Sequence, residues 1–184
     1  MAPRTKSASP RRSSPGAPWK RLRETLLATI SQIVERPRKR LRATHVAAVC
    51  YRIRNNEVEF LLVRTRAGRW TFPKGRIEDD PSPAHAAARE AFEEGGVHGR
   101  VDQEPFTSYL HSKGASLFRD EHFVDAHLCR VFELSPAEES YRDPTWFSAA
   151  KSKLRLQERR GRRHGNELER VVETAISLIK RNKH

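Results

Sequence analysis

The chain has 184 residues, of which 36% are hydrophobic, so it can form one modest core with appendages, and a second large domain is excluded. Its formal net charge of +13 is uneven: residues 1–43 carry 12 Lys and Arg against two acidic residues, whereas the remaining residues carry 24 against 21. No run approaches the roughly 18 consecutive apolar residues of a membrane span, and no cleavable leader pattern begins the chain. We therefore expect a soluble, cytoplasmic protein without a membrane span.

The first 43 residues are expected to form a basic extension in two parts. Residues 1–18 are rich in Ser, Pro and Arg and have no acidic residue, which predicts a disordered tail. Residues 19–43 place an apolar stripe at helical spacing beside a run of cations, which predicts an amphipathic helix and a linker. We expect the stripe to dock on the rest of the protein or on a second copy, as a homodimer, rather than on a membrane. The cations allow weak contact with nucleic acid, but no recognisable DNA or RNA module accompanies them.

Residues 44–184 are expected to form one domain around a mixed β-sheet. Alternating or β-branched segments predict strands at residues 44–53, 58–64 and 121–133, and one or two more within 97–109. Asn55 and Asn56 mark a turn, and Cys50 and Cys129 are expected to be buried free thiols in strands. Helices are expected up to residue 156 and over 166–179, and residues 113–119 are expected to be a loop that closes over a substrate.

The most informative segment is a short helix behind a glycine turn. Ser82 is a suitable N-cap, Pro83 a suitable first helical residue, and Gly95 with Gly96 a suitable end. At about 100° per residue, three carboxylates fall within one sector of roughly 100°, beside an alanine-rich apolar sector. These carboxylates are Glu90, Glu93 and Glu94.

Oxygen ligands on a rigid helix suit a hard cation such as Mg²⁺ or Mn²⁺, which shares its remaining coordination with substrate phosphates. A solvated helix surface, with Arg89 and Glu93 as an i, i+4 pair, is the competing interpretation of these residues. The spacing of the surrounding residues decides between the two.

The segment resembles the Nudix box, G-x5-E-x7-R-E-U-x-E-E-x-G-U, in which U is aliphatic. The positions that match in register are Gly75, Arg89, Glu90, Ala91, Glu93, Glu94, Gly96 and Val97. The first Glu of the pattern would fall at position 81, where this chain has Pro81. The neighbouring Glu78, Asp79 and Asp80 could supply that carboxylate from a shifted loop.

The residues before the box extend the resemblance. Trp70, Pro73, Lys74 and Gly75 fit W-x-x-P-K-G, which is similar to the entry of MutT-like Nudix members that act on diadenosine polyphosphates and diphosphoinositol polyphosphates. Cations gather around this loop and would stabilise a polyanion. The candidate substrate-binding residues are Arg64, Lys74, Arg76, Arg162 and Arg163. The last two belong to a basic cluster at residues 159–164, expected on a loop, whose alternative is a solvated surface.

The resemblance implies a Nudix-type α/β/α sandwich, within the α/β (α+β) class. It further implies that Gly75, Glu90, Glu93 and Glu94 hold Mg²⁺ or Mn²⁺, that Glu93 and Glu94 are catalytic, and that Arg89 orients the glutamates. The expected activity is hydrolysis of a diphosphate bond in a phosphorylated small molecule, either a linked nucleoside diphosphate or an inositol polyphosphate. The alternative is a catalytically impaired Nudix fold that senses a nucleotide or binds nucleic acid. Glu121, Glu138 and Glu139 remain candidates for a general base, and no histidine is assigned catalysis.

Overall fold

The structure is a computed structural model that describes residues 43–113 and 120–182. The basic tail, the amphipathic helix and nearly all of the basic linker that the sequence predicts lie outside the described residues. The same holds for residues 114–119 of the expected substrate-covering loop.

The domain expected at residues 44–184 contains eight strands and three α-helices among its described residues. The strands are β1 His45–Arg54, β2 Glu57–Arg64, β3 Trp70–Thr71, β4 Lys74–Arg76, β5 Val97–Val101, β6 Thr107–Lys113, β7 Asp120–Leu134 and β8 Thr145–Ser148. The helices are α2 Pro83–Gly95, α3 Ala149–Gln157 and α4 Arg162–Arg181, with a 3₁₀ turn, η1, at Ser140–Arg142.

The sheet is mixed, as predicted, and β1 lies at its centre. β1 pairs antiparallel with β2 and with the short β4, and parallel with β7. β7 also pairs antiparallel with β5 and β6, and β2 with β3 and β8. Asn55 and Asn56 both have positive φ in the tight β1–β2 turn, which confirms the predicted turn.

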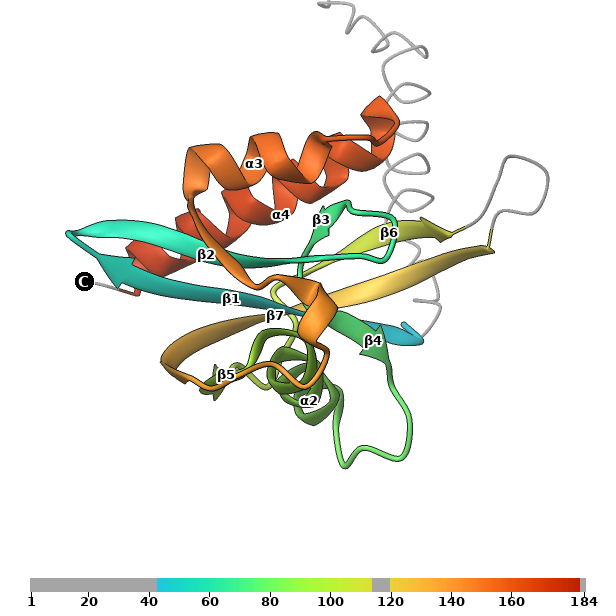
Figure 1. Cartoon of the computed structure of the whole chain (residues 1–184), viewed down its shortest axis with the longest axis horizontal. Helices are drawn as coiled ribbons and strands as arrows, with labels where there is room; N and C mark the ends of the chain where they lie inside the picture. The colour runs from blue at the N-terminus through green and yellow to red at the C-terminus, as the bar shows by residue number, and fades with distance from the viewer. Residues whose placement is uncertain (1–42, 114–119, 183–184) are drawn as a thin grey trace, which may run out of the picture. The chain divides into compact units, whose positions relative to one another are not determined.

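The sheet is covered on both faces, so the fold is the expected α/β/α sandwich. Figure 1 shows α3 and α4 on one face and α2 on the other. The alternation of β1 divides its side chains between two cores: Ala47 and Val49 pack on the α3/α4 side, and Val46 and Ala48 on the α2 side. The α2 core also contains Cys50 and Cys129, opposite each other on β1 and β7 as buried free thiols.

Helix α2 begins and ends where the sequence predicts. The Ser82 hydroxyl accepts the His85 N–H, Pro83 is the first helical residue, and Gly96 ends the helix with φ 62°. A side chain at Gly96 would also meet the Ser135 carbonyl oxygen at 1.9 Å. Both local conformation and packing therefore fix this end of α2.

Helix α4 begins four residues earlier than predicted. The sequence predicts a loop through Gly165, but the helix starts at Arg162, so Arg162, Arg163 and His164 form its first turn. The early start has a physical reason, because two side chains of the first turns bind the free edge of β6. His164 Nδ1 lies 3.1 Å from the Leu110 carbonyl oxygen, and the Glu167 carboxylate accepts the Leu110 N–H at 3.1 Å.

No helix in the described part of the chain has the length and apolar character needed to cross a membrane.

Candidate functional site: a carboxylate helix beside two cation-rich cavities

The site begins where β4 pairs with β1 and passes over helix α2. This pairing places Gly75 opposite Val46 and brings the β4 backbone against the helix. A Cβ atom added at Gly75 would lie 2.0 Å from Glu90 Oε1, so any other residue at this position would have to displace that carboxylate. Gly75 therefore lets Glu90 keep its place against β4.

Glu90 and Glu94 lie one helical turn apart and both are buried. Their exposed fractions are 7% and 2%, which excludes the interpretation of these two residues as a solvated helix surface. Burial raises the pKa of Glu90, and it raises that of Glu94 to about 7. These carboxylates lie in an environment that favours a positive partner.

Glu94 is held by two hydrogen-bond donors from outside the box helix, one of which is charged. Its Oε2 accepts the Lys74 backbone N–H at 3.2 Å, and its Oε1 forms an ion pair with the Arg142 guanidinium. Arg142 lies on η1 and also forms an ion pair with Glu139. The sequence analysis missed Arg142, because nothing in its local sequence links it to the box.

Arg89 joins the box helix to the loop before it. Its Nε and Nη2 each donate to Asp80, both at 3.2 Å, and its Nη1 donates to Glu90 at 2.9 Å and to Glu93 at 3.1 Å. The Arg89 guanidinium lowers the pKa of Asp80. Asp80 thus provides a carboxylate immediately before Pro81, where the box pattern has its first Glu.

Glu93 is more exposed than Glu90 and Glu94, and its backbone carbonyl contacts the residue just before η1. The Glu93 carbonyl oxygen accepts the Glu139 N–H at 3.1 Å. The Glu139 carboxylate accepts the Tyr141 hydroxyl at 2.9 Å. Of the three candidate general bases, Glu139 lies at the carboxylate helix and lines the cavity beside it, whereas Glu121 lines a second cavity.

A cavity of about 590 Å³ opens beside Glu94. Positive side chains predominate around it, and it also has four of the chain's eight histidines along its wall. Its charged and histidine side chains are His45, Arg66, Arg69, Lys74, Arg76, Glu94, His111, His122, Glu139, Arg142, Arg160 and His164. Burial lowers the pKa of Lys74, although Glu94 partly opposes that shift.

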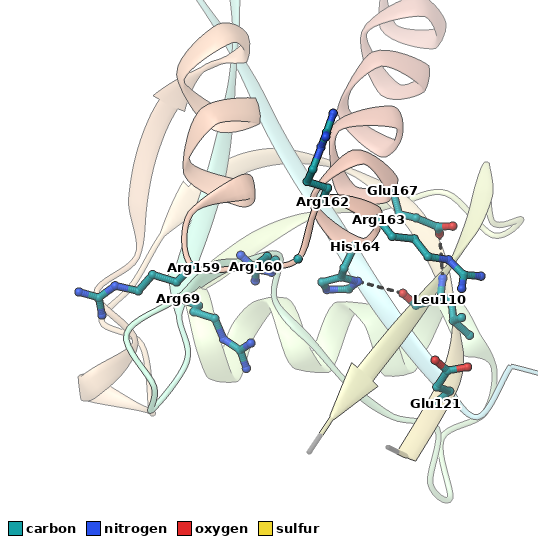
Figure 2. A pocket seen from close by; sticks show the side chains of 10 residues that line it. Arg69, Leu110, Glu121, Arg159, Arg160, Arg162, Arg163, His164 and Glu167 are labelled. Atoms are coloured by element: carbon teal, nitrogen blue, oxygen red, sulfur yellow. Dashed lines mark hydrogen bonds between the residues drawn. The ribbon is translucent and has the colours of Figure 1, made fainter. Parts of the chain in front are cut away.

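A smaller cavity of about 330 Å³ adjoins the first, and the two share Arg69, Arg160 and His164 (Figure 2). Arg163 and Glu167 line it from α4. Burial lowers the pKa of Arg160 to about 10. The Arg160 guanidinium donates to the carbonyl oxygens of Leu156 and Trp70, which fixes it between the two cavities.

The predicted substrate-binding cations occupy three different places. Lys74 and Arg76 line the larger cavity, and Arg162 and Arg163 line the smaller one. Arg64 lines neither: its guanidinium pairs with Asp143 at 3.0 Å and stacks 4.2 Å from the Trp70 ring centre. The cavities are also lined by Arg69, by Arg160 of the predicted basic cluster and by Arg142, and of these three only Arg142 belongs to neither predicted group of cations.

The donor chemistry of Glu90 and Glu94 fits a hard divalent cation, because both are buried carboxylates that offer oxygen ligands. In the structure Glu90 pairs with Arg89 and Glu94 with Arg142. Within residues 43–113 and 120–182, no three side chains of His, Cys, Asp or Glu stand together as a ready metal site. A cation at Glu90 and Glu94 would compete with Arg89 and Arg142 for these carboxylates.

Comparison with known proteins identifies the class. The NUDIX domain family model matches residues 43–166, which include the sheet, the box helix and the start of α4. The chain belongs to the Nudix family.

Similar proteins support the same assignment. Nudix hydrolase 21, chloroplastic, of Arabidopsis thaliana is 30% identical over 112 residues, covering 58% of this chain and 56% of that protein. Diphosphoinositol polyphosphate phosphohydrolase 3-beta of Bos taurus is 38% identical over 56 residues, or 30% of this chain and 34% of that protein. The chain thus spans about half of the plant relative and a third of the bovine one.

A solved structure shares the fold. The crystal structure of a C. elegans Ap4A hydrolase binary complex aligns with a TM-score of 0.58 at 16% identity, over 75% of this chain and 98% of that one. At this identity the likeness concerns the fold alone.

Proposed function

We propose that the protein is a metal-dependent pyrophosphohydrolase that cleaves a diphosphate bond in a nucleoside or inositol polyphosphate. The observation that carries the proposal is the burial of two carboxylates one helical turn apart. Glu90 lies against Gly75, and Glu94 lines a cavity together with Lys74 and Arg142. Buried carboxylates beside converging cations suit a metal-assisted reaction of a phosphate anion.

Two observations support the substrate class: the charge of the side chains that line the cavities, and the name of a similar protein. The two adjoining cavities have many more cations than carboxylates among their described lining residues, which favours a ligand with several phosphates. The bovine relative is named for diphosphoinositol polyphosphates.

In this mechanism Glu90, Glu93 and Glu94, with the Gly75 carbonyl, would hold Mg²⁺ or Mn²⁺. The bound ion would neutralise phosphate charge and lower the pKa of water. Lys74 and Arg76 would bind the phosphate oxygens, and Arg89 would hold the glutamates in place through its contacts with Asp80. Glu139 is the candidate that would accept the proton of the attacking water.

A second candidate function is a binding module without turnover. The ion pair between Arg142 and Glu94 favours it, because a guanidinium already neutralises the carboxylate that a metal would need. In that case the cavities would bind a phosphorylated ligand, and Arg142 would keep Glu94 paired.

One experiment separates the two functions. Hydrolysis products are measured by chromatography with Mg²⁺ and with Mn²⁺ on a panel of nucleoside and inositol polyphosphates, together with ligand binding to the same panel. If the protein is a hydrolase, Glu94→Gln should lower kcat by at least ~10²-fold, because the variant loses the carboxylate charge that would bind the metal. Glu57→Gln, at an exposed position in the β1–β2 turn region, is the control and should retain activity. Binding without turnover of any substrate would favour the binding module.

A further inference from the structure

Four histidines that have no role assigned from the sequence gather in the larger cavity. His45, His111, His122 and His164 come from β1, β6, β7 and α4, and all four line the larger cavity. The His45 and His122 rings stack with centres 4.4 Å apart, and the His111 and His164 rings meet edge to face at 5.4 Å. Four imidazoles thus line a cavity whose other charged walls are mainly cationic.

The contact with β6 fixes the tautomer of His164. A carbonyl oxygen only accepts, so the 3.1 Å contact with Leu110 requires the proton of neutral His164 to lie on Nδ1 (Figure 2). Its Nε2 then has a lone pair and cannot donate to a phosphate oxygen. His164 can bind a phosphate through Nε2 only after it takes up a proton.

The cations around His111 and His164 oppose that protonation when no anion is present. Burial, followed by Lys74 and His164, lowers the pKa of His111 to about 3. Burial, Arg160 and Arg69 lower the pKa of His164. The hydrogen bond with the Leu110 carbonyl and the charge of Glu167 partly oppose this shift. Arg160 and His122 also oppose the protonation of His111. The smaller cavity, beside His164, has further charged groups in Glu121, Arg159, Arg162 and Arg163.

A polyanion in the cavity would neutralise the cations that suppress these charges, and it would offer acceptors to a protonated imidazole. We propose that the cavity binds polyphosphate together with protons, and that His111 and His164 are the residues that take the protons up. The proposal rests on the proposed function only in placing phosphate groups in this cavity. By linkage, affinity then rises on acidification, approaching tenfold per pH unit for each whole proton taken up.

The test measures protons directly. Tripolyphosphate is titrated into the full chain in EDTA, so that hydrolysis does not contribute, by calorimetry in two buffers of different ionisation enthalpy near neutral pH. The difference in heat gives the number of protons bound. We expect wild type to take up close to one proton more than the variant His164→Asn, whose amide nitrogen can still donate to Leu110 but cannot gain a proton. His111→Gln should show a similar loss.

The matched control is His98→Gln. His98 lies on β5, contacts Ser135 at 3.1 Å and lines neither cavity, so its loss should leave proton uptake unchanged. A second measurement needs no variant: the histidine ring signals of the wild-type chain are titrated with pH by nuclear magnetic resonance, with and without tripolyphosphate. Two ring signals should titrate below neutral pH without the ligand and above neutral pH with it.

Several results would overturn the proposal. These are equal proton uptake by wild type and both cavity variants, ring titrations that the ligand does not move, and failure of wild type to bind tripolyphosphate. The outcome is independent of catalysis. Turnover without linked protons would remove this inference and leave the proposed hydrolase, whereas linked protons without turnover would leave the inference and remove the hydrolase.

Discussion

Arg89 and Asp80 form a two-point ion pair, with Nε and Nη2 of the guanidinium each 3.2 Å from a different oxygen of the carboxylate. The same guanidinium donates to Glu90 and Glu93 through Nη1. Asp80 is therefore connected through Arg89 to two of the three box glutamates. Asp80 lies one residue before Pro81, the position at which the box pattern has its first Glu.

The first prediction tests this relationship by moving the carboxylate. Asp80→Asn should lower kcat by about 10-fold or more, because Arg89 loses a charge-assisted pair and the glutamates lose their orientation. The double variant Asp80→Asn with Pro81→Glu, which restores a carboxylate at the box position, should recover part of the loss. Steady-state kinetics and Mn²⁺ affinity by electron paramagnetic resonance measure both effects.

Asp79→Asn is the matched control, because Asp79 is exposed on the same loop. Its kinetics should equal those of wild type. Equal activity in Asp80→Asn and Asp79→Asn would show that the pair has no influence on the glutamates.

Local sequence predicts the box helix well and the remainder of the site poorly. Ser82, Pro83 and Gly96 determine the ends of α2 through interactions within a few residues, so pattern alone locates them. The sequence left three carboxylates open as the replacement at Pro81, because the path of a loop decides which one reaches Arg89. Arg142 reaches Glu94 only through tertiary packing, which no spacing rule encodes.

The start of α4 and the histidine cluster were missed for a similar reason. Gly161 and Gly165 suggested a loop, but side-chain contacts with the edge of β6 stabilise helix from Arg162 onward. The cluster depends on the register of β6 with β7, which pairs His111 with His122. Registers between strands distant in sequence are fixed by the whole sheet rather than by local pattern.

The second prediction concerns the contact between Gly75 and Glu90. Gly75→Ala should destabilise the fold by about 1–3 kcal/mol and reduce turnover, because the new methyl group must displace the buried carboxylate. Thermal unfolding and kcat are the measurements.

Gly161→Ala is the stability control: nothing lies within 4 Å of its added Cβ, and its φ is −64°. Its unfolding free energy should change by less than about 0.5 kcal/mol, because loss of the helix-start preference for Gly and reduced entropy of the unfolded chain oppose each other. Equal stability of both variants would contradict the close contact.

The third prediction concerns Arg142 as the partner of Glu94. Without metal, Arg142→Gln should lower the unfolding free energy by about 3 kcal/mol, because it leaves a carboxylate that is 2% exposed without its guanidinium. Mn²⁺ should restore much of that loss, so the metal-induced rise in Tm should be larger in the variant than in wild type. Arg155→Gln removes a surface pair with Glu158 and should cost less than about 1 kcal/mol with no metal dependence. An identical metal-induced shift in wild type and Arg142→Gln would contradict competition between the arginine and the ion.

The last prediction concerns substrate length. If the smaller cavity binds phosphates beyond the cleaved bond, kcat/KM should rise from adenosine diphosphate sugar through diadenosine triphosphate to diadenosine hexaphosphate. Each well-formed charge-assisted contact contributes about 1.5–3 kcal/mol of binding free energy, which corresponds to a rise in kcat/KM of roughly tenfold or more. The gain should shrink in Arg163→Ala and at high salt. It should shrink less in Arg162→Ala, because Figure 2 shows the Arg162 side chain directed away from His164.

Arg100→Ala, exposed on β5 and outside both cavities, should leave the series unchanged. If the shortest substrate is best, the cations of α4 serve solubility rather than recognition, and membership of the Nudix family stands without a preference for long polyphosphates.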